Sequence, residues 1–187
     1  MRSEIRIVAL SGKHLVGRTL AESVFQTTIL PALEGCRPDD RLVLSFAGVE
    51  LATGSFLKAT WLKIHQTQPR GPRCLVTDLC EEVRSEFDIF LHGNRLPGLE
   101  ATDWTDDGVS VARLHGRIED AAYAALRLLT EMRGATAPEL YRASDQRLTP
   151  TAWTNRLNEL WRLGLAYREP AGRASRFYPA ANEVLRG

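Results

Sequence analysis

Polar side chains that can contact nucleic acid lie at helical spacing in one stretch near the C-terminal end of this 187-residue chain. They are Thr151, Asn155, Asn158 and Arg162, with Thr154 and Arg156 at the margins of the same face. Residues three and four positions apart share one face of a helix. Amide and hydroxyl groups hydrogen-bond base edges, and guanidinium groups bind phosphates. The spacing therefore predicts a DNA-binding face on which Thr151, Asn155 and Asn158 read bases. Arg162 lies farther along the helix and is expected to meet phosphate.

A helix must carry this polar face, and the flanking residues predict one from Thr149 to Gly164. A hydroxyl caps the first turn of a helix, and the proline at position 150 has no N–H that needs a partner. Glycine at position 164 is a stop signal, because it readily adopts the left-handed conformation found at helix ends. Between them four apolar residues form the opposite stripe: Trp153, Leu157, Leu160 and Trp161. We expect both tryptophans to anchor the core and not to stack on bases.

Two short strand-like runs follow this helix, around Pro170-Ala171-Gly172. Arg173 and Arg176 lie near the turn of this hairpin, and we expect them to contact phosphates or the minor groove. Residues 117–187 hold 11 basic and 8 acidic residues, whereas residues 1–116 hold 13 and 15. The C-terminal excess of +3 is entirely arginine but small, so solvated surface arginines are the alternative explanation.

Two further helices are predicted before the polar one. The first opens at Glu119-Asp120, and the second is capped by Thr136 with Glu139 three residues later, which is the capping-box pattern. A resemblance to winged helix-turn-helix regulators of the multiple-antibiotic-resistance type covers about residues 117–180 and includes AALRLLTEMRGATAPELYRASDQRLTPTAWTNRLNELWRLGLAYREPAGRASRFYPA. The shared features are the capped second helix, R-L-x-x-L near the end of the third, Gly-Leu at its exit and Gly-Arg at the wing tip. The resemblance implies a third helix in the major groove of double-stranded DNA, a wing on the backbone or minor groove, and a homodimer on two half-sites.

The first part of the chain alternates predicted strands and helices, which indicates a small α/β domain. The predicted strands are Glu4–Leu10, Arg41–Phe46, Cys74–Thr77 and Val109–Leu114. Pro31 is expected to kink or end the first helix, which starts near Thr19. Residues 95–108 read as a loop that could include an edge strand. Gly116 marks the predicted boundary between a domain at 1–116 and a winged helix-turn-helix domain at 117–187.

A second resemblance rests on residues 41–64, RLVLSFAGVELATGSFLKATWLKI. This stretch is similar to STAS-like domains, the small mixed-sheet α/β folds of anti-sigma-factor antagonists and of a related family of unknown function. The resemblance implies a protein partner and a serine at a helix start that a partner kinase phosphorylates, and Ser55 occupies that position. Ser45 stands where an aspartate is usual, and Thr-Gly-Ser-Phe replaces Asp-Ser-Ser-Gly. Ser55 is thus either a phosphorylation or anion site at the positive end of a helix or simply the helix cap.

Patterns of catalytic residues do not occur in the sequence. The four histidines, at positions 14, 65, 92 and 115, belong to no HExxH motif, and there is no Gly-rich phosphate loop or G-x-S-x-G elbow. Cys74 and Cys80 match no zinc spacing with the histidines. The acidic run between Asp78 and Asp88 is typical of a solvated helix face. We therefore expect no enzymatic activity, no cofactor and no metal.

Apolar runs long enough to cross a membrane do not occur. Three cysteines, an odd number with no signal peptide before them, favour free thiols in a reduced cytoplasmic compartment. We expect a cytoplasmic transcription regulator in which a winged helix reads duplex DNA and a STAS-like domain senses a signal or binds a partner. The alternative is an adaptor or antagonist in a partner-switching or kinase-linked system, in which the winged helix docks on protein.

Overall fold

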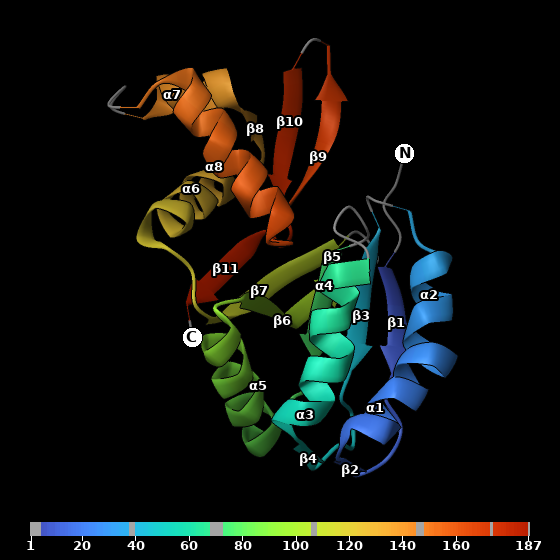
Figure 1. Ribbon diagram of the computed structural model, residues 1–187. Coiled ribbons are helices and arrows are strands. Elements are labelled where there is room, and N and C mark those ends of the chain that lie inside the picture. Colours follow the sequence, from blue (N-terminus) through green and yellow to red (C-terminus); the bar gives the residue numbers. More distant parts are fainter. Residues whose placement is uncertain are drawn as a thin grey trace.

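The computed structural model describes residues 5–37, 40–67, 73–105, 108–144, 148–172 and 174–186. Within these residues the chain is a mixed α/β protein built on a six-stranded sheet in the order β1-β3-β5-β6-β7-β11 (Figure 1). The strands are β1 (Ile5–Ala9), β3 (Arg41–Ser45), β5 (Arg73–Thr77), β6 (Pro97–Thr105), β7 (Gly108–Gly116) and β11 (Glu183–Arg186). The first four run parallel, β7 is antiparallel to β6, and β11 is parallel to β7. The mixed α/β class expected from the sequence is confirmed.

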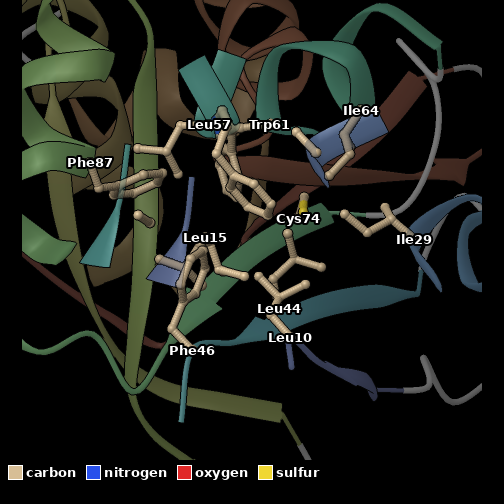
Figure 2. Close-up of a cluster of buried hydrophobic side chains, with 14 of the residues drawn as sticks. Leu10, Leu15, Ile29, Leu44, Phe46, Leu57, Trp61, Ile64, Cys74 and Phe87 are labelled. Atoms are coloured by element: carbon tan, nitrogen blue, oxygen red, sulfur yellow. The ribbon is translucent and has the colours of Figure 1, made fainter. Parts of the chain in front are cut away.

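Helices that connect the parallel strands all cover one face of this sheet (Figure 1). The first consists of α1 (Arg18–Val24), the π-helical turn η1 (Phe25–Ile29) and α2 (Leu30–Glu34); the second of α3 (Gly54–Leu57), η2 (Lys58–Leu62) and α4 (Lys63–Thr67); the third is α5 (Glu81–Asn94). Their inner side chains meet those of the sheet in one apolar cluster. Figure 2 shows part of this cluster, with Trp61 and Phe87 from the helices, Leu44 from β3 and Phe46 directly after β3.

Pro31 was expected either to kink the first helix or to end it, and it does not end it. The helix continues to Glu34, and the proline is the second residue of α2, which follows the wider turn η1. There the N–H of Leu30 bonds to the carbonyl of Phe25, five residues back. A proline has no N–H for the ladder and its ring crowds a preceding carbonyl, and a locally wider turn relieves both constraints.

Strand β6 corrects the expectation of a loop at residues 95–108. It lies between β5 and β7, and its first five residues are buried. Gly98 is required there, because a Cβ atom would lie 2.7 Å from Leu91 Cδ1 and 2.9 Å from Phe87 Cζ of α5. The glycine that favoured a loop in the sequence therefore marks the close approach of a helix to a strand.

The buried apolar side chains on the opposite face of the sheet belong to a second cluster, which they share with the C-terminal helices. These helices are α6 (Asp120–Glu131), α7 (Ala137–Ala143) and α8 (Pro150–Arg162), accompanied by a three-stranded sheet in the order β8 (Ala135–Thr136), β10 (Ala174–Pro179), β9 (Ala166–Ala171). Thr149 caps α8 and Thr136 forms the capping box of α7 with Glu139, so both predicted helix starts are confirmed. Val43 and Leu75 of the large sheet share one buried cluster with side chains of α6, α7 and α8.

Two contacts join the C-terminal helices and hairpin to the large sheet. Arg41, a buried residue of β3, donates a hydrogen bond from Nε to the carbonyl of Ala180 (3.2 Å), and its guanidinium lies 5.3 Å from the ring centroid of Tyr167 in β9. After β10 the chain then returns to the large sheet as β11, a strand that the sequence analysis missed. Segment 117–187, for which a separate domain is expected, thus supplies one strand to the sheet built by residues 1–116.

Among the described residues Cys36, Cys74 and Cys80 form no disulfide, and Cys74 is buried in the first apolar cluster. Burial raises the pKa of the Cys74 thiol. Among the helices that the structure describes, none has the length and apolar character needed to cross a membrane.

Replacement of Gly116 by alanine is expected to destabilise the fold by about 3 kcal/mol or more, because a left-handed alanine is strained and a new Cβ would overpack the site. Gly116 has φ +74°, and its Cβ would strike the carbonyl of Leu96 and lie 2.6 Å from Leu91 Cβ. Urea unfolding followed by circular dichroism measures the loss.

Gly48→Ala is the matched control, because Gly48 has nearly the same φ, +79°, with no atom within 4 Å of the new Cβ. It should cost only the backbone strain, about 1–2 kcal/mol. Equal losses of unfolding free energy in the two variants would show that the close packing around Gly116 does not add to the cost of its replacement.

Candidate functional site

The polar face of α8 is held outward by its apolar stripe. Trp153, Leu157 and Leu160 are buried in the second cluster, at 4%, 0% and 0% exposure. The face predicted to bind DNA lies on the other side of the helix. On it Thr151, Thr154, Asn155 and Arg162 are exposed, and Asn158 and Arg156 are half-buried. The packing therefore leaves this face open to a partner.

Several of these side chains already have contacts within the protein. Thr154 Oγ1 donates to the carbonyl of Pro150 (3.0 Å), and Arg162 Nε donates to the carbonyl of Asn158 (3.4 Å). The Arg156 guanidinium lies 5.5 Å from the centroid of the Trp153 ring. Among the described residues, Thr151 and Asn155 have no side-chain hydrogen-bond partner. These two are the side chains with the most freedom to bind base edges.

Arg168 of β9 lies beside this face, and the sequence analysis missed it. Its guanidinium stacks 3.9 Å from the centroid of the Trp161 ring, and its Nη1 donates to Asn158 Oδ1 at 3.4 Å. Trp161 is half-buried and packs against the second cluster, as expected for a core anchor, and its ring also carries the Arg168 cation. A basic residue followed by an acidic one in a strand after a tryptophan-bearing helix end gives no distinctive signal in the sequence.

Arg176 points away from the hairpin tip and into the base of the C-terminal helices. Its Nη1 donates to both carboxylate oxygens of Glu139 (3.0 Å each), and its Nη2 donates to the carbonyl of Gly134 (3.0 Å). The Thr136 backbone N–H and the Arg176 guanidinium together lower the pKa of Glu139. Arg176 is therefore engaged by the capping box of α7. Arg173, expected to contact phosphate at the same hairpin, lies outside the described residues.

Ser55 is exposed in the first turn of α3, but the N-cap of that helix is Thr53 and not Ser55. Thr53 Oγ1 accepts from the backbone N–H of Phe56 (3.4 Å) and lies 3.0 Å from Ser55 Oγ. Ser45, which stands where the STAS-like pattern has aspartate, donates its hydroxyl to Asp78 Oδ2 (2.7 Å). The interpretation of Ser55 as a helix cap is wrong, because the preceding threonine already occupies that position.

A buried ionic network, unforeseen from the sequence, lies between α5 and β6–β7. Glu100, 3% exposed, accepts hydrogen bonds from Arg84 Nε (3.1 Å) and Nη2 (2.9 Å) and faces His115 Nε2 at 2.8 Å. The register of β6 on β7 places Glu100 directly opposite Arg113, whose Nη1 lies 4.0 Å from Glu100 Oε2. Glu100 thus has a cation or a histidine on three sides.

Burial alone would raise the pKa of the Glu100 carboxyl, but the hydrogen bonds from His115 and Arg84 outweigh it and lower the pKa to about 2. Asp88 extends the network, because its Oδ1 accepts from the Gly116 N–H (2.8 Å) and lies 3.8 Å from His115 Nδ1. Its Oδ2 lies 3.2 Å from His92 Nδ1. The network therefore connects α5 to the end of β7.

A groove of about 770 Å³ opens onto this network. It is lined by α5, by the end of β7 and the start of the segment that leads to α6, and by β11; the lining residues are Glu81, Arg84, Ser85, Asp88, His92, Arg113, Leu114, His115, Gly116, Ile118 and Arg186. Among the described residues, no group of three or more His, Cys, Asp and Glu side chains could hold a metal ion.

Comparison with known proteins gives no relative. No protein-family model matches the chain, and neither a curated protein nor a solved structure is significantly similar to it.

Replacement of Glu100 by glutamine is expected to cost on the order of 3 kcal/mol at neutral pH, because it leaves buried donors facing a neutral group. Since the folded-state pKa of about 2 lies below the unfolded value, the stabilisation is present above about pH 4.5 and is lost as the pH falls toward 2. The unfolding free energy of the wild type should therefore fall more steeply between these pH values than that of Glu100→Gln.

Glu22→Gln serves as the control, because Glu22 is exposed and pairs with Arg18 across one helical turn. Such a pair contributes less than about 1 kcal/mol. If Glu100→Gln matched this control in stability at pH 7 and in acid sensitivity, the network would not support the fold.

Proposed function

We propose that the protein is a DNA-binding transcription regulator in which α6, α7, α8 and the β9–β10 hairpin form a winged helix-turn-helix. The order of the elements supports this assignment: helix, short strand, two helices, hairpin. The short strand β8 pairs with β10, so the small sheet has the order β8-β10-β9 and the hairpin extends as a wing beside α8. In this arrangement α8 is the recognition helix, whose N-terminal residues reach base edges.

The observation that carries the proposal is the exposed, unpaired centre of the α8 polar face. Thr151 and Asn155 lie one turn apart in the first half of α8, and both are exposed. A side chain can read a base only when its donors and acceptors are not already satisfied within the protein. The major groove, about 12 Å wide, admits a helix that presents these two side chains.

Cations flank the two base readers. Arg162 lies at the far end of α8, and Arg168 is held on Trp161 beside it. The one acidic residue of α8, Glu159, lies one turn after Asn155 and lines a small cavity with Arg95 and Arg117, so two guanidinium groups share its surroundings. A face with amides at its centre and guanidinium groups at its margin matches the division between base contacts and phosphate contacts. Two such faces in a homodimer would read two half-sites, which light scattering of the protein with and without duplex tests.

The α/β part is proposed to be a STAS-like domain that senses a signal or binds a protein partner. The exposed hydroxyl of Ser55, at the N-terminal turn of its helix, supports a regulatory role for this part, because a phosphate there would face unpaired backbone N–H groups. The same observation favours the second candidate function, an adaptor or antagonist in a kinase-linked system whose winged helix docks on protein.

Asn155→Ala is expected to weaken binding to the preferred duplex by about 1–3 kcal/mol and to relax the preference at one base pair, since a base contact is lost. Arg162→Ala should weaken all duplexes alike and reduce the slope of log affinity against log salt by about 1, since one phosphate contact is lost. Selection from a random duplex library identifies the preferred sequence, and fluorescence anisotropy between about 50 and 200 mM KCl measures the affinities.

Arg18→Ala, an exposed arginine of α1, is the control and should change neither affinity nor salt slope. Equal losses for the two α8 variants on every sequence would contradict the division of labour. If selection enriched no sequence and binding did not depend on α8, the adaptor function would replace the DNA-binding one.

A further inference from the structure

The groove between α5 and the β7–β11 edge of the sheet has no role in the proposed function. Its volume of about 770 Å³ lies within the range of small-molecule sites, about 300–1,000 Å³. Its two apolar lining residues, Leu114 and Ile118, are almost wholly buried in the second cluster, and the rest of the lining is mostly polar or charged. Concave shape and a few converging polar groups are among the general properties of ligand sites.

Two arginines at this groove have guanidinium N–H donors that no protein group accepts within the described residues. Arg84 uses Nε and Nη2 on Glu100 and on the Leu79 carbonyl, and its Nη1 has no hydrogen-bond partner within the described parts of the chain. Arg113 keeps 41% of its side chain exposed, and its closest carboxylate, Glu100, is 4.0 Å away, beyond hydrogen-bond distance. Because both guanidinium groups lie within 4.0 Å of the same buried carboxylate, they are close enough to share a second anion.

Arginines outnumber carboxylates among the residues that line the groove. Asp88 accepts the Gly116 N–H and pairs with His92, so its oxygens are already engaged. Arg186 of β11 adds a third guanidinium, which lies 5.0 Å from the centroid of the Tyr123 ring. Glu81 is the remaining carboxylate of the lining, at the first turn of α5. The lining thus carries three arginines against two carboxylates, with Glu100 behind the wall.

We propose that this groove binds a small organic anion, a carboxylate or a phosphate monoester, through Arg113 and Arg84. Arg186 adds a third guanidinium group to the lining. Planar guanidinium groups are suited to both kinds of anion, because each presents paired N–H donors to two oxygens.

Such a ligand would act on the segment that connects the sheet to the C-terminal helices. Gly116 is tied to Asp88, and Ile118, two residues later, belongs to the second apolar cluster with α6 and α8. An anion held between α5 and the end of β7 therefore contacts the point from which α6 starts. This second step rests on the proposed function: the anion would change the DNA affinity of α8.

The test measures binding first without DNA. Thermal unfolding is followed in rising concentrations of citrate, as the carboxylate probe, and of inorganic phosphate, with potassium chloride at equal ionic strength as the reference. A site predicts a saturating rise in Tm of a few degrees above the chloride reference, because a ligand that binds only the folded state stabilises it. A response to citrate alone assigns carboxylates, a response to phosphate alone assigns phosphate esters, and a response to both assigns the site to anions of either kind.

Arg113→Gln and, separately, Arg186→Gln should lose most of this rise, while Arg18→Gln, outside the groove, should keep it. Two single variants are used because neither arginine has a hydrogen bond on which the buried network depends. If neither probe raised Tm above the chloride reference, or if the rise were the same in both groove variants as in the wild type, the site would be refuted.

DNA affinity is then measured with and without the effective probe, at constant ionic strength. A change of at least about fivefold in the wild type, absent in Arg113→Gln, is expected for coupled sites. An unchanged affinity in a protein that binds both probe and DNA overturns the regulatory step alone. Failure to bind any duplex overturns the proposed function, and the groove is then judged from the Tm data by themselves.

Discussion

Strands β3 and β5 alternate their side chains between two apolar clusters, and neither face of the sheet can be left in water. Leu42 and Leu44 enter the cluster under α1–α5, while Val43 and Leu75 enter the cluster that contains α6, α7 and α8. A parallel sheet buried on both faces needs cover on both. The connecting helices all lie on one face, and the buried apolar side chains of the other face share the second cluster with the C-terminal helices. The apolar stripe of α8 lies in this cluster, so its polar face is turned outward.

Local signals were sufficient for the helices that carry the proposed DNA contacts. A cap needs only a hydroxyl and the backbone N–H groups three residues on, so Thr149 and Thr136 could be assigned from the sequence, and the periodic stripe of α8 identified which face is buried. Strands β6 and β11 could not be assigned, because a strand is defined by pairing with residues elsewhere in the chain. β11 has four residues and no periodicity long enough to read.

The ionic network illustrates the same limit for a site. Glu100 and His115 are 15 residues apart, and nothing in their neighbours distinguishes them from surface residues. They meet because β6 and β7 pair in a register that sets Glu100 opposite Arg113 and diagonal to His115. Arg176 gives the converse case. Its place near a hairpin turn indicated phosphate binding. The pairing of β10 with β8 instead brings it to Glu139, and the Glu139 carboxylate accepts its hydrogen bonds.

The pairing of β11 with β7 also orders events during synthesis. Residues 117–182, with all of the C-terminal helices and the hairpin, lie between two neighbouring strands of one sheet. On the ribosome, β1, β3, β5, β6 and β7 emerge first, and the sixth strand arrives only after this long insertion. Until then the β7 edge is an open row of N–H and C=O groups, a template for pairing with another nascent chain. The arginine at position 113 and the histidine at 115 place polar side chains on β7 during the time before β11 pairs with it.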